Sequence, residues 1–270
     1  MTKDNNFISH QNNLSKFGFK HEGTGVHTSR TMMYEELHLL LDTVNNPSAQ
    51  IEEYIEAIVE DNCLGKRSVR NRKITATRLK ELYGLNDSIA LFRVLHFFWS
   101  RDELGRPLIA LLCALTRDQL LYKTIPFILK YKEGETITRV ELEGFIDEIM
   151  PDNYSSSTLK SIAQNINSTW TKSGHLQGRA KKIRTKAAAT PGSVAYALLL
   201  SYLTGARGEY LFNTQFTRVL DCSYSELLDL AEEASRRGWI VLKRIGEVIE
   251  VQFPSLLTKE ELEWVNEQNR

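Results

Sequence analysis

Four Ser or Thr residues stand three positions before a Glu or Gln, each at the start of a stretch with helical apolar periodicity: Thr116 with Gln119, Thr138 with Glu141, Ser223 with Glu226, and Thr258 with Glu261. This is the spacing of a capping box, in which two side chains satisfy the free backbone N–H groups at a helix start. Asn46-Pro47 and Ser68 predict two further starts, and Gly84, Gly174 and Gly238 stand where helices should end. The sequence therefore predicts a chain of many helices.

Strand signals are few. Trp239 to Leu242 and Val248 to Phe253 predict a short hairpin that follows a helix, and a weaker strand signal follows Gly174. We predict a mainly α fold: a multi-helix bundle with one or two winged-helix-like units and a short C-terminal β-hairpin. We expect three parts, with a flexible N-terminal segment over 1–29, a helical domain with a basic helix over 30–134, and a helical, winged-helix-like domain with an acidic C-terminal extension over 135–270.

Composition and apolar run lengths limit where the chain works. The longest apolar runs, such as Val194 to Leu203, are about ten residues, whereas a membrane-spanning helix needs roughly 20. The segment Met1 to Ser15 is polar and has no export signal, and the three cysteines lie far apart. We expect a cytoplasmic protein with no membrane partner.

A search for catalytic motifs gives nothing that favours an enzyme. Gly65-Lys66-Arg67-Ser68 lacks the first glycine and the Lys-Ser or Lys-Thr pair of a phosphate-binding loop. Pro151-Asp152 is followed by no acidic residue until Glu209, so a nuclease-like carboxylate pair is missing. The six histidines do not combine with each other or with cysteine into a convincing zinc pattern. We expect no enzymatic activity, no metal and no cofactor.

The net charge is zero, but the charges are segregated. Asn62 to Lys80 contains seven basic residues and no acidic residue, and Asn153 to Gly208 contains eight basic residues and no acidic residue. The rest of the chain carries 19 basic and 34 acidic residues. Two cationic blocks in an anionic body are typical of a protein that binds a polyanion through restricted surfaces.

The first basic block begins a predicted helix. Its cations recur every three or four residues, so that several share one face beside the N–H groups of the helix N-terminus, which suits phosphate oxygens. The alternative is a solvated face balanced by the acidic helix before it. The candidate DNA-binding residues of this block are Lys66, Arg67, Arg70, Arg72 and Lys73.

The second basic block has the outline of a winged helix-turn-helix. Thr138 to Ile149 and Ser155 to Ser173 predict two helices joined by a turn, and a basic hairpin or loop follows. The second helix has an apolar stripe and an opposite face of Ser, Thr, Asn, Gln and Lys, the side chains that hydrogen-bond phosphates and base edges. The alternative is a polar surface helix followed by a flexible basic loop. The candidate DNA-binding residues are Lys160, Gln164, Asn165, Lys172, Arg179, Lys181, Lys182 and Arg184.

The helix Ser223 to Arg237 and the hairpin after it repeat this outline, but Glu226, Asp229, Glu232 and Glu233 on that helix would repel phosphate. We interpret this unit as structural or protein-contacting.

Two stretches resemble a known family. Asp61-Asn62-Cys63-Leu64-Gly65-Lys66-Arg67-Ser68, with the spaced arginines after it and Leu79-Lys80-Glu81-Leu82-Tyr83, resembles the signature stretch of the BrxA family of bacteriophage-exclusion (BREX) defence systems. Ser157-Thr158 to Trp170 and Gly174-His175-Leu176 resemble a later segment of that family, and the resemblance spans about residues 30 to 200. It implies a non-enzymatic, mostly helical, cytoplasmic DNA-binding protein that works beside other phage-defence proteins. The Asn-rich N-terminus and the acidic extension after about residue 208 depart from the family.

The sequence thus favours a protein that binds double-stranded DNA chiefly through phosphates, as part of a phage-defence assembly. Two other functions remain open. An RNA-binding helical factor would stack bases on exposed aromatic residues, which the basic blocks almost lack. An interaction scaffold would dock its cationic faces on acidic partner proteins.

Overall fold

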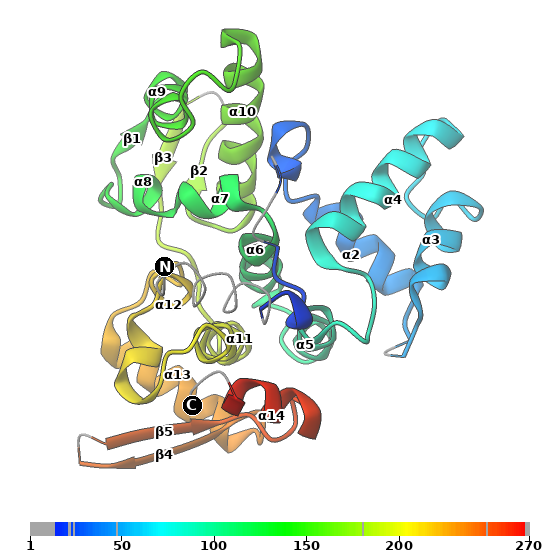
Figure 1. The fold of residues 1–270 in the computed structure, drawn as a ribbon. Coiled ribbons are helices and arrows are strands. Elements are labelled where there is room, and N and C mark those ends of the chain that lie inside the picture. Colours follow the sequence, from blue (N-terminus) through cyan, green and yellow to red (C-terminus); the bar gives the residue numbers. More distant parts are fainter. Residues whose placement is uncertain are drawn as a thin grey trace, which may run out of the picture.

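The computed structural model describes residues 14–20, 23, 25–46, 48–179, 181–246 and 248–267. The described chain is mainly helical, as predicted. Two helices lie at its centre, α6 (Arg106–Arg117) and α11 (Pro191–Leu203), and they pack on each other and on α5 (Ala90–Trp99) (Figure 1). Ten consecutive residues of α6, Leu108–Arg117, are buried. A helix that is apolar on all sides must lie inside the protein, which explains the long apolar runs in the sequence.

Three groups of elements surround these central helices (Figure 1). The first holds the 3-10 helix η1 (Val26–Thr28), α2 (Tyr34–Thr43), α3 (Ile51–Val59) and α4 (Val69–Tyr83). The second runs from α7 (Gln119–Lys123) and α8 (Ile125–Leu129) through β1 (Thr136–Ile137), α9 (Arg139–Ile149), α10 (Ser156–Lys172) and β2 (Leu176–Gln177) to β3 (Lys182–Arg184). The third comprises the 3-10 helix η2 (Gly208–Asn213), α12 (Gln215–Arg218), α13 (Tyr224–Arg236), β4 (Val241–Ile245), β5 (Val248–Gln252) and α14 (Lys259–Glu267).

The second group has the topology of a winged helix. A helix, a strand, two helices and two strands follow one another, and the antiparallel sheet has the order β1-β3-β2. Thr136 pairs with Ile183, and Gln177 pairs with the same residue from the other side. The sequence predicted α9, α10 and the strands after Gly174 but missed β1, which is two residues long and begins just after the division predicted near residue 134.

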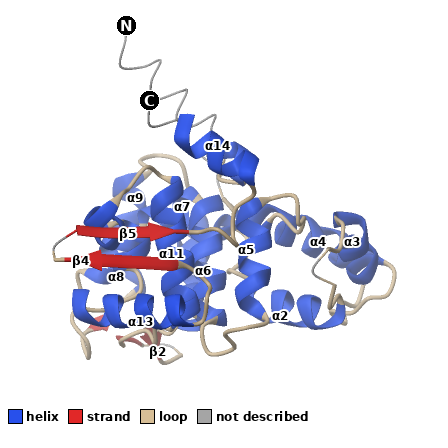
Figure 2. Ribbon diagram, turned by 90° about the horizontal axis from the view of Figure 1, so that it is seen from below, coloured by secondary structure: helices blue, strands red, loops and turns tan. Residues whose placement is uncertain are grey.

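The third group repeats the helix-and-hairpin outline. Strands β4 and β5 pair antiparallel over five residues, with Val241 opposite Gln252 and Ile245 opposite Val248 (Figure 2). Ile249 and Val251 are buried and alternate with exposed residues, which is the period of a strand with one face on the core. The predicted C-terminal hairpin is confirmed.

Most of the predicted helix ends are also confirmed. Ser68 caps α4, and capping boxes form at Thr138 with Glu141 and at Ser223 with Glu226. At the start of α14, Thr258 N donates to Glu261 Oε2 and Glu261 N donates to Thr258 Oγ1. The box at Thr116 is wrong.

Two starts differ from the prediction. The carboxylate of Asp118 accepts the N–H of Leu121 and caps α7, whereas the Thr116 hydroxyl is buried and donates to the Cys113 carbonyl within α6. The helix predicted to begin at Asn46-Pro47 begins at Ile51 after a Gln50 cap, and Pro47 itself lies outside the described residues.

The segment 1–29, predicted to be flexible, is packed against the body where the structure describes it. Phe17 and His27 are fully buried. His27 Nδ1 lies 2.8 Å from Asp118 Oδ2, and His27 Nε2 lies 2.8 Å from Thr169 Oγ1. The Thr169 oxygen also accepts the N–H of Met32 at 2.9 Å. This buried cluster, His27–Asp118–Thr169, joins η1 and the α6–α7 junction to α10.

No helix among the described ranges has the length and apolarity needed to cross a membrane. In the same residues, no group of three His, Cys, Asp or Glu side chains is placed to hold a metal ion.

The Thr169→Val substitution tests the cluster. It keeps the side-chain shape but leaves the Met32 N–H and one His27 nitrogen without their partner, so we expect the free energy of unfolding to fall by about 2–3 kcal/mol. The Thr77→Val control removes an exposed hydroxyl that bonds only to its own helix, at the Lys73 carbonyl, and should change it by less than about 0.5 kcal/mol. Urea unfolding followed by circular dichroism measures both, and equal effects would contradict the role given to the cluster.

Candidate nucleic-acid interface

Helix α10 occupies the recognition-helix position of the winged unit. Ile162, Ala163, Ile166 and Trp170 are buried, which fixes the inner side of the helix. The opposite side is polar, and its exposed residues are Ser156, Ser157, Lys160, Ser161 and Gln164. The predicted amphipathic pattern is confirmed, and it places Lys160 and Gln164 together on the outer surface.

The wing is the turn between β2 and β3. Gly178 begins it with φ of +93°, and a Cβ at that position would clash with the backbone oxygen of Lys181. Glycine is therefore required for the tight turn. Arg179 and Lys181 are exposed on the turn. Lys182 is half-buried, and its Nζ donates to Thr171 Oγ1 at 2.9 Å and to the Gly178 carbonyl at 2.7 Å, so it holds the wing against α10.

A hollow of about 530 Å³ opens where α9, α10 and the wing meet. Asn167 lines the hollow, and its buried Oδ1 has no hydrogen-bond partner among the described residues. The walls carry one cation from α9 and two from the wing and β3. The lining residues are Arg139, Val140, Gln164, Asn167, Ser168, Arg179 and Lys182.

Arg139 is the basic residue here that sequence reasoning missed. It is the first residue of α9, and its Nε lies 2.7 Å from Glu143 Oε1 one turn later. Arg139 stands in an acidic stretch of the sequence, outside the two basic blocks, so it was not among the predicted residues. Its place directly after the strand that pairs with the wing could have been inferred only from the topology.

Besides Lys182, three predicted residues of the second block are engaged within the protein. Arg184 is buried, and its Nη1 lies 2.8 Å from Asp221 Oδ2, so it faces inward and does not reach a surface ligand. Lys172 pairs with Glu35 at the start of α2. Asn165 donates its amide to the carbonyl of His27 at 3.1 Å. Lys160, Arg179 and Lys181 form no ion pair with any described residue.

The predicted residues of the first block also fall into two sets, those engaged within the protein and those exposed without a side-chain partner in the part of the chain that the structure describes. Lys66 pairs with Glu36 at 2.9 Å. Arg72 Nη1 donates to the carbonyls of Val59 and Glu60, which are free at the end of α3, so it serves as a helix cap. Arg67, Arg70 and Lys73 are exposed at the start of α4.

The first turn of α2 lies between the two blocks. Its neighbouring residues Glu35 and Glu36 each pair with one block, Glu35 with Lys172 at the end of α10 and Glu36 with Lys66 before α4. Figure 1 places α2 between α10 and α4. The blocks thus flank one acidic turn and are not a continuous cationic surface.

The His27–Asp118–Thr169 cluster has the residue types of a nucleophile, base and acid triad. All three residues are fully buried, and the Thr169 oxygen is occupied by the Met32 N–H and by His27. A substrate cannot reach this oxygen, so the cluster is structural.

His175 fixes the base of the wing. Its Nε2 lies 2.7 Å from the carbonyl of Val219, and its Nδ1 lies 2.8 Å from Ser173 Oγ. Because a carbonyl oxygen only accepts, Nε2 carries a proton. Complete burial lowers the pKa of His175 from 6.5 to about 4, with the nearby Arg184 acting in the same direction.

Comparison with known proteins identifies no family for this site. No protein-family model matches the chain, and a search of the curated proteins finds no match.

His175 predicts a pH dependence of stability. Because its pKa is lower in the folded state, the unfolded chain takes up the proton first as the pH falls below 6.5. The stabilisation is complete above pH 6.5 and is lost towards pH 4, by up to about 3 kcal/mol. In His175→Gln, whose amide can still donate to Val219, this loss should largely vanish. Urea unfolding from pH 8 to pH 4 measures it, with His38→Gln, at a partly exposed histidine on α2, expected to keep the wild-type profile.

Proposed function

We propose that this protein binds duplex DNA through its first winged unit, with the outer side of α10 at a groove and the wing on the flanking backbone. The observation that carries the proposal is the set Lys160, Arg179 and Lys181: three exposed cations on the recognition helix and the wing, without ion-pair partners among the described residues. Most other cations of the two blocks have internal carboxylate or carbonyl partners. An unpaired cation is free to replace a counterion on a phosphate.

Phosphate contacts dominate in this proposal. Gln164 and the serines of α10 add hydrogen bonds to phosphates or base edges, but Asn165, the other amide predicted to contact bases, is held by His27. The hollow beside Gln164, a space of about 530 Å³ that is large enough for a phosphate group, places Lys182 and Arg139, which also have partners within the protein, around the unpaired Arg179. Because contacts to phosphates outnumber contacts to base edges, we expect DNA binding with little sequence preference.

The proposal extends to a cellular role through the sequence resemblance. A BREX-type phage-defence component would act in the cytoplasm without catalysing a reaction, beside other defence proteins. The independent support is the winged topology, which occurs in the region that resembles the family. Single-stranded RNA is less suited to this surface, because the exposed aromatic side chains Tyr210 and Tyr224 belong to the third group and not to α10 or the wing.

Fluorescence anisotropy with a random duplex of about 30 base pairs tests the proposal. Each phosphate contact adds about −0.9 to the slope of log affinity against log salt, so Lys160→Ala/Arg179→Ala/Lys181→Ala should make the slope shallower by about 2–3 and weaken binding at least tenfold at about 0.1 M salt. Replacing Arg67 and Arg70 by alanine measures the share of the first block.

The matched control, Lys243→Ala/Arg244→Ala/Lys259→Ala, removes three exposed cations from the C-terminal unit and should bind almost as the wild type does. Equal weakening by both triple variants would mean that net charge alone governs binding and would refute the assignment to α10 and the wing. Stronger binding to a single-stranded RNA of the same length would favour an RNA-binding factor. Weak binding that salt hardly affects would favour the scaffold alternative.

A further inference from the structure

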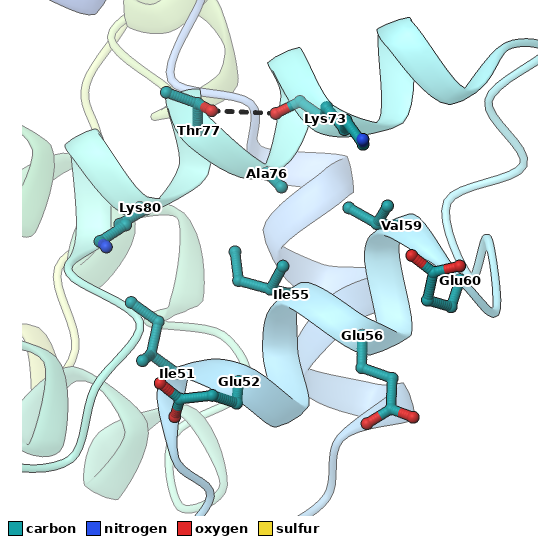
Figure 3. Close-up of a pocket in the computed structure, with 10 residues that line it drawn as sticks. All are labelled: Ile51, Glu52, Ile55, Glu56, Val59, Glu60, Lys73, Ala76, Thr77 and Lys80. Atoms are coloured by element: carbon teal, nitrogen blue, oxygen red, sulfur yellow. Dashed lines mark hydrogen bonds between the residues drawn. The ribbon is translucent and has the colours of Figure 1, made fainter.

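A groove of about 900 Å³ runs between α3 and α4, in the first group of elements and away from the winged unit (Figures 1 and 3). Its floor is apolar. Ile51, Ile55 and Val59 recur every four residues along α3, and Ala76 faces them from α4. Ile51 and Ile55 remain partly exposed in the groove. Val59 and Ala76 are buried beneath the groove. Two partly exposed isoleucines over a buried apolar floor between two helices are typical of a binding groove.

The two edges of the groove carry opposite charge. Glu52, Glu56 and Glu60 line the edge formed by α3, and Lys73 and Lys80 line the edge formed by α4 (Figure 3). All five side chains are exposed, and none of them forms an ion pair with a described residue. The three glutamates would repel a phosphate backbone, so a nucleic acid does not fit this groove.

We propose that this groove binds an amphipathic helix of a partner protein. The apolar stripe of that helix would lie on Ile51, Ile55 and Val59, with Lys or Arg along one flank facing the glutamates and Asp or Glu along the other facing Lys73 and Lys80. Charge complementarity selects this occupant, because only a chain with both signs of charge satisfies both edges. The nine residues from Ile51 to Val59 span eight rises of 1.5 Å, or about 12 Å, which matches two to three turns of a bound helix.

A second copy of this chain is a poorer occupant. In a two-fold contact between α3–α4 pairs, the edges would be charge-complementary, but two concave grooves placed face to face would leave both floors unfilled. Unfilled apolar space loses packing contacts on both sides. A convex helix fills the floor and reaches both edges.

Designed peptides test the proposal on the full-length protein. The probe is a 16-residue helical peptide with a Leu stripe, a Lys flank and a Glu flank, compared with peptides in which both flanks are Lys, both are Glu, or the stripe is Ser. Methyl NMR of Ile and Val follows the groove. We expect the mixed-flank peptide to shift the methyl signals of Ile51, Ile55 and Val59 but not that of Ile162. It should bind about five- to tenfold more tightly than either single-charge peptide. The Ser-stripe peptide should not bind.

Variants of the protein make the test specific. Glu52→Gln/Glu56→Gln should weaken the mixed-flank peptide about fivefold, whereas the matched control Glu148→Gln/Glu263→Gln should bind it normally. Thr77→Trp should block the groove without touching the core, because Thr77 is exposed on its edge, and a thermal melt checks that this variant folds. DNA anisotropy of these variants should equal that of the wild type, so a failure of the DNA proposal would not be mistaken for a failure here.

Equal binding of all three Leu-stripe peptides, or binding that survives Thr77→Trp, would overturn the proposal. Groove methyls that shift with protein concentration and not with peptide, together with dimer formation in sedimentation velocity, would also overturn it, in favour of a second copy.

Discussion

The hydrogen bonds of His27 hold together three parts of the chain that are far apart in sequence. Its ring bridges the Asp118 carboxylate and the Thr169 hydroxyl, and its own N–H donates to the same carboxylate at 2.9 Å. Burial alone would raise the pKa of Asp118, but the attraction to His27 and the hydrogen bonds from His27 and Leu121 outweigh it and hold this pKa below its usual range. A buried carboxylate is tolerated only with such partners, so the cluster fixes α10 on the body in one position. The outer side of α10 is oriented by a contact on its inner side.

The same constraint divides the basic residues into two classes. A cation near the core must have a polar partner. Arg184 forms an ion pair with Asp221. Arg72 donates to a carbonyl at the end of α3, and Arg117 donates to the Lys80 and Glu81 carbonyls at the end of α4. These cations join elements to one another. The exposed cations Lys160, Arg179 and Lys181 need no partner in the folded protein and remain available to an anion. The excess of acidic residues elsewhere in the chain supplies the internal partners, so the neutral net charge does not argue against a polyanion ligand.

Local patterns in the sequence predicted most of the helices and strands. Contacts between residues far apart in the sequence could not be predicted. The caps at Ser68, Thr138 and Ser223 depend on residues three positions away, and the apolar stripe of α10 depends on one helix only, so both could be predicted. Asp118 displaced the predicted cap at Thr116 because its carboxylate also binds His27, 91 residues away. The basic character of residues 179–186 was predicted correctly as a sequence pattern, but the inward direction of Arg184 depends on Asp221 in another unit. Arg139 and the α3–α4 groove could not be predicted, because each depends on how separate elements meet.

The winged unit and the third group differ because the third group supports the wing. Helix α13 precedes the hairpin of the third group as α10 precedes the wing, yet its Glu226 pairs with Lys186 just after β3. That ion pair connects the base of the wing to the first turn of α13, and the Arg184–Asp221 pair and the His175–Val219 hydrogen bond connect it to the segment between α12 and α13. Two of them bury at least one polar group, so a shift of the wing relative to the third group would leave that group unpaired. The acidic unit therefore holds the wing of the first unit at a fixed angle to α10. The proposed phosphate contacts on α10 and on the wing then fall on one rigid surface, which reduces the entropy that binding would otherwise cost.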